Sequence, residues 1–77
     1  MKSWCVRRID DRASRVLDAM GRHVGNLKWI GGVWKFKAIG YDAAGAVIPG
    51  GGPLTAQHNM VFDSLDPVQI SRALDGA

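Results

Sequence analysis

The clearest periodic pattern in the chain lies between residues 13 and 24. Apolar side chains recur there at intervals of three and four residues, at Ala13, Val16, Leu17, Met20 and Val24. On a helical wheel these positions fall within an arc of about 100°, and Asp10 or Asp11 precedes them as a possible N-cap. The pattern predicts an amphipathic helix. Its polar side would carry three arginines, Arg12, Arg15 and Arg22.

A β-hairpin is predicted directly after this helix. The β-rich runs 27–30 and 33–41 are separated by Gly31 and Gly32, which suit a two-residue hairpin loop. Counting outward from the loop places Lys28 opposite Lys35. Since directly paired residues share a face of the sheet, one face should hold Leu27, Trp29, Trp34, Phe36 and Ala38. The other face should hold Lys28, Ile30, Val33, Lys35, Lys37, Ile39 and Tyr41.

The aromatic side chains of the hairpin have two possible roles. Aromatic residues interleaved with lysines are typical of a surface on which nucleic-acid bases stack. The predicted register instead separates the lysines from the aromatics. We therefore expect Trp29, Trp34 and Phe36 to fill the core of a small domain, against the helix at 13–24.

The remaining segments complete a predicted α+β fold. Alternation in residues 3–9 predicts a first strand, and the turn at 42–45 leads to a strand at 46–49 in which Pro49 suggests an edge. "PGGGP" reads as a flexible connection. Residues 54–63 match strand and helix templates about equally, and we favour a strand. Asp66 and Pro67 begin a last helix that Gly76 would end. The predicted architecture is a single small α+β domain, residues 1–77, with an antiparallel sheet of about four strands in β-α-β-β-β-α order, one helix on its aromatic face and a short C-terminal helix.

Composition adds a strong asymmetry of charge. The chain has 77 residues, of which 47% are hydrophobic and 22% charged, as in a folded protein. Residues 1–37 carry nine lysines and arginines against three aspartates, a net charge of +6, and residues 38–77 carry one arginine against four aspartates, a net charge of −3. The split favours an anionic partner, unless the acidic half folds back onto the basic half. The single cysteine, Cys5, and an N-terminus without a secretion signal favour a cytoplasmic protein.

No motif for chemistry stands out. His23, His58 and Cys5 lack the spacing of a zinc site, the chain has no glutamate, and "IPGGGPLT" lacks the Gly-Lys-Ser/Thr ending of a phosphate loop. We therefore predict no catalytic residue, metal or cofactor.

The favoured function is that of a non-enzymatic regulatory protein. Proteins of this size include inhibitors and modulators that phages direct against larger host proteins, and a basic face would dock on an acidic surface of such a partner. DNA or RNA binding through the same residues is the first alternative, assembly through an exposed edge at 46–49 is the second, and no membrane is involved. The predicted binding residues are Lys28, Lys35, Lys37, Arg7, Arg8 and Arg12.

Overall fold

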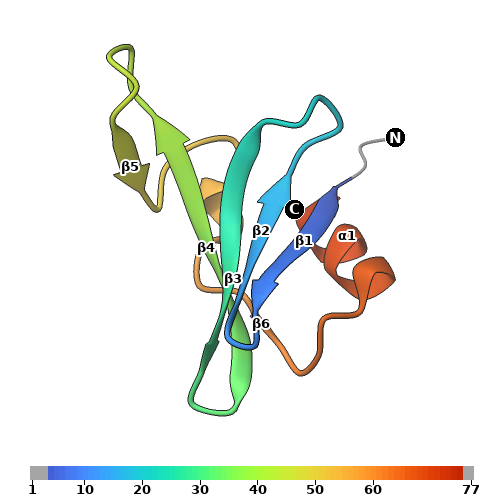
Figure 1. The fold of residues 1–77 in the computed structure, drawn as a ribbon. Helices are drawn as coiled ribbons and strands as arrows, with labels where there is room; N and C mark the ends of the chain where they lie inside the picture. The colour runs from blue at the N-terminus through green and yellow to red at the C-terminus, as the bar shows by residue number, and fades with distance from the viewer. Residues whose placement is uncertain (1–3, 76–77) are drawn as a thin grey trace.

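Five strands follow one another in chain order across an antiparallel sheet in the computed structural model, which describes residues 4–75 (Figure 1). A sixth short strand, β6, lies beside the first half of β4, and a single α-helix closes the described chain, so the protein is a small α+β domain. The strands are β1 (Cys5–Asp10), β2 (Ala13–Leu17), β3 (His23–Ile30), β4 (Val33–Tyr41), β5 (Val47–Pro49) and β6 (Val61–Phe62). The helices are a one-turn 3₁₀ helix, η1 (Thr55–Gln57), and α1 (Pro67–Asp75).

The helix predicted at 13–24 is wrong, and with it the β-α-β-β-β-α order. This segment forms β2, a turn and the start of β3. Ser14 and Val16 alternate into the core with no exposed surface, as a strand requires. The turn is set by Asp18, whose Oδ1 accepts the backbone N–H of Met20 and of Arg22 at 2.9 Å each, and by Gly21 at a φ of 82°. Local turn chemistry therefore outweighs the helical spacing of the apolar residues.

The predicted hairpin is confirmed residue by residue. Ile30 pairs with Val33 next to the glycine loop, and Lys28 pairs with Lys35. The aromatic face is also confirmed as the core face, because Leu27 and Phe36 are fully buried. Trp29 is the exception: its side chain is 41% exposed at the end of the hairpin, where its ring centroid lies 5.5 Å from that of Trp34.

The core face is covered from the C-terminal part of the chain, and not by a helix at 13–24. Ile70 and Leu74 of α1 pack behind the sheet with Leu54 and Phe62. Figure 1 shows α1 and the segment before it on the far side of the sheet, which leaves the near face of β1–β4 uncovered. The fold therefore has one buried and one open sheet face.

Residues 54–63 form neither one continuous strand nor one continuous helix. η1 comes first, Asn59 then adopts a φ of 73°, and only Val61–Phe62 is strand. The backbone around this turn still pairs with β4, because Phe36 N–H donates to the carbonyl of Met60 at 2.7 Å. The predicted strand is thus confirmed only at its end.

The C-terminal helix is confirmed at its start. Pro67 is its first residue, and Asp66 Oδ1 accepts the backbone N–H of Val68 at 3.0 Å. The predicted stop at Gly76 lies outside the described residues.

The glycine-rich connection is packed, contrary to the expectation of a loose linker. Gly50 N–H donates to the carbonyl of Ala38 at 2.7 Å. Gly52 lies against Gly40 so closely that a Cβ on Gly40 would come within 2.6 Å of the Gly52 nitrogen. The glycines thus let backbone pack on backbone. The preceding turn and edge strand are as predicted, with Gly45 N–H donating to the carbonyl of Asp42 at 3.0 Å and Pro49 pairing with Ile39.

Candidate docking face

Direct cross-strand partners form a row of polar side chains across four strands. Arg7 of β1 pairs with Arg15 of β2, Arg15 pairs with Asn26 of β3, and Asn26 pairs with Lys37 of β4. Because direct partners share a face of the sheet, all four side chains leave it on the same side. The row crosses three strand spacings, or about 14 Å.

A second row runs beside the first on the same face. It contains Asp10, Ala13, Lys28, Lys35 and Val61, paired in that order from β1 to β6. Lys28 and Lys35 are each two residues from a member of the first row on their own strand, so they share its face. The two rows together carry the five cations that we call the basic face: Arg7, Arg15, Lys28, Lys35 and Lys37.

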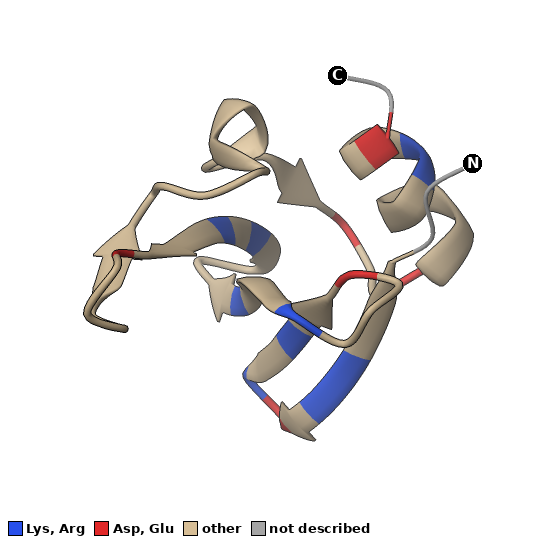
Figure 2. Cartoon of the chain, turned by 90° about the horizontal axis from the view of Figure 1, so that it is seen from above, with Lys and Arg blue, Asp and Glu red and all other residues tan. Residues whose placement is uncertain are grey.

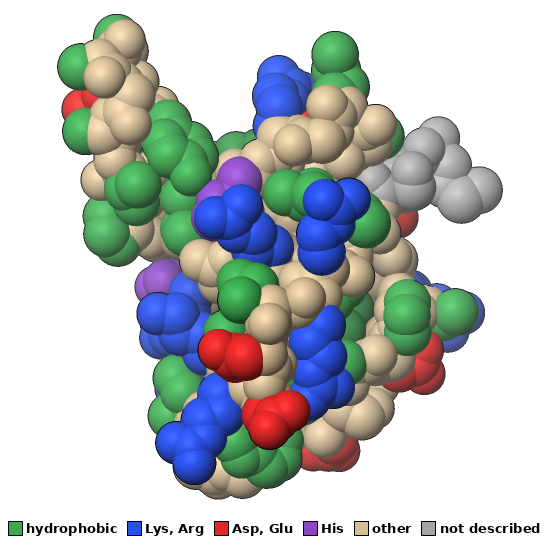
Figure 3. All heavy atoms as spheres, viewed as in Figure 1, with side chains coloured by type: hydrophobic (Ala, Val, Ile, Leu, Met, Phe, Trp, Pro, Cys, Tyr) green, Lys and Arg blue, Asp and Glu red, His purple; other side chains and the backbone are tan. Residues whose placement is uncertain are grey.

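The basic face is the uncovered side of the sheet. Arg7, Arg15 and Lys28 are exposed, and Lys35 and Lys37 are half-buried. Figure 3 shows lysine and arginine side chains spread over the front of the molecule, with acidic ones lower down near the turn between β1 and β2. In Figure 2 most cationic positions lie on the strands, whereas most acidic ones lie in turns or near α1. The lysines and arginines are therefore concentrated on the open face of the sheet, and most aspartates lie outside it.

Within residues 4–75 no carboxylate forms an ion pair with the basic face. The single ion pair of this region joins Arg22 Nε to Asp18 Oδ2 at 2.8 Å, in the turn between β2 and β3. Lys37 Nζ donates to a neutral acceptor, Asn59 Oδ1, at 2.6 Å.

Three of the four aspartates of residues 38–77, Asp42, Asp66 and Asp75, form hydrogen bonds away from the basic face. Asp42 Oδ1 accepts the backbone N–H of Ala44 and of Ala46 in its own turn, and Asp75 accepts the indole N–H of Trp4 at 2.7 Å. Asp66 caps α1. Within residues 4–75, no aspartate of the acidic half forms an ion pair with a lysine or arginine of the basic half.

Four of the six predicted binding residues meet on the basic face: Arg7, Lys28, Lys35 and Lys37. Arg8 lies apart from them, with its guanidinium carbon 5.7 Å from the centroid of the Trp34 ring and its Nε donating to the carbonyl of Asp10. Arg12 lies in the turn between β1 and β2, where its backbone N–H donates to Asp10 Oδ1 at 2.8 Å. Two of the predicted binding residues, Arg8 and Arg12, therefore do not belong to the basic face.

Arg15 belongs to the basic face but was not predicted there. The helical interpretation of 13–24 placed it on the polar side of a helix, apart from the lysines of the hairpin. If 13–17 is written as a strand after a two-residue turn at Asp11 and Arg12, Arg15 falls opposite Arg8. In the structure a register shift between Arg8 and Asp10 moves the pairing by one residue, so that Arg15 pairs with Arg7.

A polar network holds Asn26 in the middle of the face. His23 Nε2 lies 2.8 Å from Asn26 Oδ1, and His23 Nδ1 lies 2.9 Å from the Tyr41 hydroxyl. An amide oxygen only accepts hydrogen bonds, so His23 Nε2 donates to Asn26 Oδ1. The Asn26 amide is thereby fixed in orientation.

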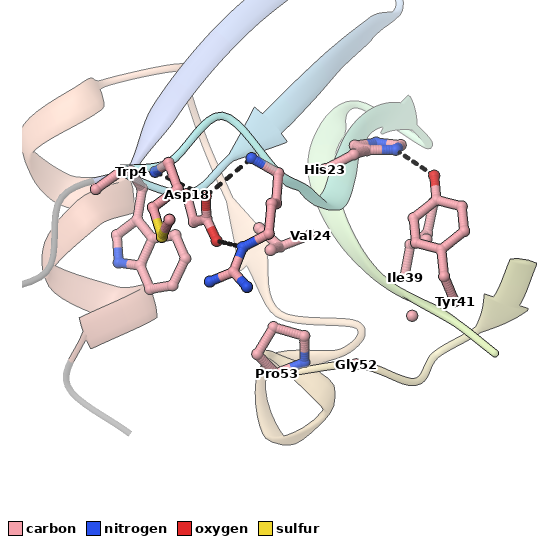
Figure 4. Close-up of a pocket in the computed structure, with 12 residues that line it drawn as sticks. Trp4, Asp18, His23, Val24, Ile39, Tyr41, Gly52 and Pro53 are labelled. Atoms are coloured by element: carbon pink, nitrogen blue, oxygen red, sulfur yellow. Dashed lines mark hydrogen bonds and ion pairs between the residues drawn. The ribbon is translucent and has the colours of Figure 1, made fainter. Parts of the chain in front are cut away.

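A hollow of about 640 Å³ lies beside the basic face, where the sheet divides. Pairing between β3 and β4 ends at Gly25 and Ala38, and the last three residues of β4 pair only with β5. Figure 4 shows the hollow between Asp18 and Trp4 on one side and Ile39 and Tyr41 on the other. Among the described residues that line the hollow, no serine, threonine or cysteine nucleophile lies beside a general base.

Asp18 is the one described residue with a clearly shifted pKa. The backbone N–H of Arg22 is the main cause that holds the pKa of this carboxyl below its usual range, and the Arg22 guanidinium and the Met20 N–H act in the same direction. Among residues 4–75 no three His, Cys, Asp or Glu side chains are grouped as a metal site would require, and no helix is long and apolar enough to span a membrane.

Comparison with protein-family models, with curated proteins and with solved structures finds no match to this chain.

Proposed function

We propose that this protein is a non-enzymatic regulator that docks the basic face of its sheet onto an acidic surface of a larger protein. The observation that supports this proposal is the gathering of five cations from four strands on one uncovered face, with no ion pair to any described carboxylate. Complementary charge speeds the encounter of two proteins and fixes their relative orientation. Occupying a partner's surface would suffice for inhibition or modulation.

Nucleic acid is the competing partner for a basic surface. Modules that bind single strands on a sheet stack bases on aromatic side chains that share the face with the cations. Here Trp34 and Phe36 belong to the opposite face and are buried in the core. This separation favours a protein partner over single-stranded nucleic acid, and leaves duplex binding through phosphates as the alternative to test.

The proposal is tested by affinity capture with matched charge reversals. The immobilised protein is exposed to a nuclease-treated lysate of its source cells or, for a phage-encoded chain, of the host. Lys35→Glu and Lys28→Glu should each lose the captured protein. Arg72→Glu on α1 changes the charge equally, away from the basic face, and should retain it.

A capture that all three variants keep would show that the basic face is not the docking site. Titration with duplex DNA and RNA at low salt addresses the alternative. Affinity for duplex that falls linearly with the logarithm of salt concentration, and that Lys35→Glu reduces, would replace the protein partner with nucleic acid.

A further inference from the structure

Four cations surround Asn26 on the basic face. Arg15 and Lys37 are its direct partners on the two neighbouring strands, Lys28 lies two residues further along β3, and Lys35 is the direct partner of Lys28. Direct and diagonal neighbours on a sheet face lie within about 4.5–8 Å of each other. We call Arg15, Lys28, Lys35 and Lys37 the Asn26 cluster.

The cluster is electrostatically unfavourable in the isolated protein. Lys28 and Lys35 are like charges placed directly opposite each other, and Arg15 faces a further like charge, Arg7, on its other side. Such pairs destabilise a sheet, and no described carboxylate forms an ion pair with them. Several anionic groups brought by another molecule would remove the repulsion.

Apolar side chains border the cluster on the same face. Val61 is the direct partner of Lys35 and is 50% exposed, and Ile30 follows Lys28 by two residues and is 44% exposed. A phosphate backbone makes no use of exposed Ile and Val side chains. A polypeptide that carries both carboxylates and apolar side chains would pair with the cations and also bury this border.

We propose that the basic face takes an acidic amphipathic polypeptide segment of the partner, with carboxylates over the Asn26 cluster and apolar side chains over Ile30 and Val61. This inference rests on the proposed docking function and adds the chemistry of the bound segment. Charge complementarity selects an acidic occupant, whereas a second copy of this chain docked face to face would bring the same five cations against them.

The test uses two polymers as probes: poly-L-glutamate and a random copolymer of glutamate and tyrosine of equal length. Both are titrated at low salt into ¹⁵N-labelled protein. We expect saturable shifts of the amides of Arg15, Asn26, Lys28 and Lys35, with the copolymer bound several-fold more tightly. Lys35→Glu should weaken both by about tenfold, and Arg72→Glu should change neither.

The apolar border has its own variant. Ile30→Ser combined with Val61→Ser changes two exposed positions, so the fold should persist, which the amide spectrum checks. This variant should bind the copolymer no more tightly than the homopolymer.

Four outcomes would overturn the inference: equal affinity of wild-type protein for the two polymers, shifts confined to residues off the basic face, no saturable binding of either polymer, or tighter binding of an oligonucleotide of equal charge. These outcomes are distinguishable from a failure of the proposed function. If any of them occurs while wild-type protein still captures a partner that Lys35→Glu does not, the docking function stands and only the amphipathic character of the bound segment is overturned.

Discussion

Lys28 and Lys35 face each other directly across the β3–β4 hairpin, on the side of the sheet away from the core. Two ammonium groups at such a position repel, whereas opposite charges there attract by up to about 1 kcal/mol. Lys35→Glu should therefore raise the free energy of unfolding of the isolated protein, by about 0.5–1 kcal/mol. Urea unfolding followed by tryptophan fluorescence measures the change.

Lys35→Gln separates the two contributions to this gain. It removes the repulsion without adding an attraction, so its unfolding free energy should lie between those of the wild type and Lys35→Glu. A loss of stability in both variants would mean that Lys35 makes a favourable contact in the free protein. In that case the Lys28–Lys35 pair would not lower the stability of the free protein, and a partner would not be needed to explain it.

The close approach of Gly52 to Gly40 gives the second prediction. A Cβ on Gly52 would meet the carbonyl oxygen of Ile39 and lie 2.9 Å from the Gly40 Cα. Gly52 also has a φ of +82°, in the left-handed region. Gly52→Ala should therefore destabilise the fold by more than about 2 kcal/mol, because backbone clash adds to left-handed strain. The measurement is the midpoint of thermal unfolding.

Gly45→Ala is the matched control for the glycine loop. Gly45 has a φ of +83°, and a Cβ there would meet nothing within 4 Å. This substitution should cost only the left-handed strain, about 1 kcal/mol. Equal losses at the two positions would show that the loop relaxes away from β4, as a flexible connection would.

The third prediction concerns Ser14, which is fully buried and whose Oγ has no hydrogen-bond partner among the described residues. A buried hydroxyl without a partner costs about 1–3 kcal/mol. Ser14→Ala should stabilise the protein by about 1 kcal/mol in urea unfolding, and Ser64→Ala, at an exposed serine, should have little effect. Destabilisation by Ser14→Ala would reveal a hydroxyl contact in solution.

The hairpin and the start of α1 were predictable because their signals are local. Two glycines fix the loop, and a two-residue loop fixes every pair outward from it, which places Lys28 opposite Lys35. Asp66 followed by Pro67 specifies a helix start, because the Asp66 carboxylate accepts the backbone N–H of Val68 and Pro67 needs no donor at the first helical position. Neither feature depends on which distant segments pack nearby.

β2 was not predictable in the same way because its identity depends on its neighbours. Val16 and Met20 fit a helical spacing, but Val16 is buried through pairing with Val6 on one side and Gly25 on the other. The pattern at 13–24 fits a helical period, and the turn at Asp18 together with the pairing to β1 and β3 overrides it. The same long-range pairing places Arg15 beside Asn26, so the centre of the candidate site was missed for the same reason as the strand.

The last prediction concerns the turn that replaces the expected helix. Because the pKa of Asp18 is lowered in the folded protein, the charged carboxylate stabilises the fold above the ordinary aspartate pKa of about 3.9. This stabilisation is lost as the pH falls through the lowered pKa. The unfolding free energy of the wild type should therefore exceed that of Asp18→Asn at about pH 6, with a difference that shrinks at acidic pH below the ordinary value.

Arg22→Ala tests the physical cause. The backbone N–H of Arg22 is the largest contribution to the lowered pKa, and this donor remains when the guanidinium is removed. NMR titration of the Asp18 carboxyl should therefore find its pKa still below the ordinary value in Arg22→Ala, with only part of the shift lost. Return of the pKa to the ordinary value would show that the ion pair at 2.8 Å sets the pKa and holds the turn, in place of the backbone hydrogen bonds.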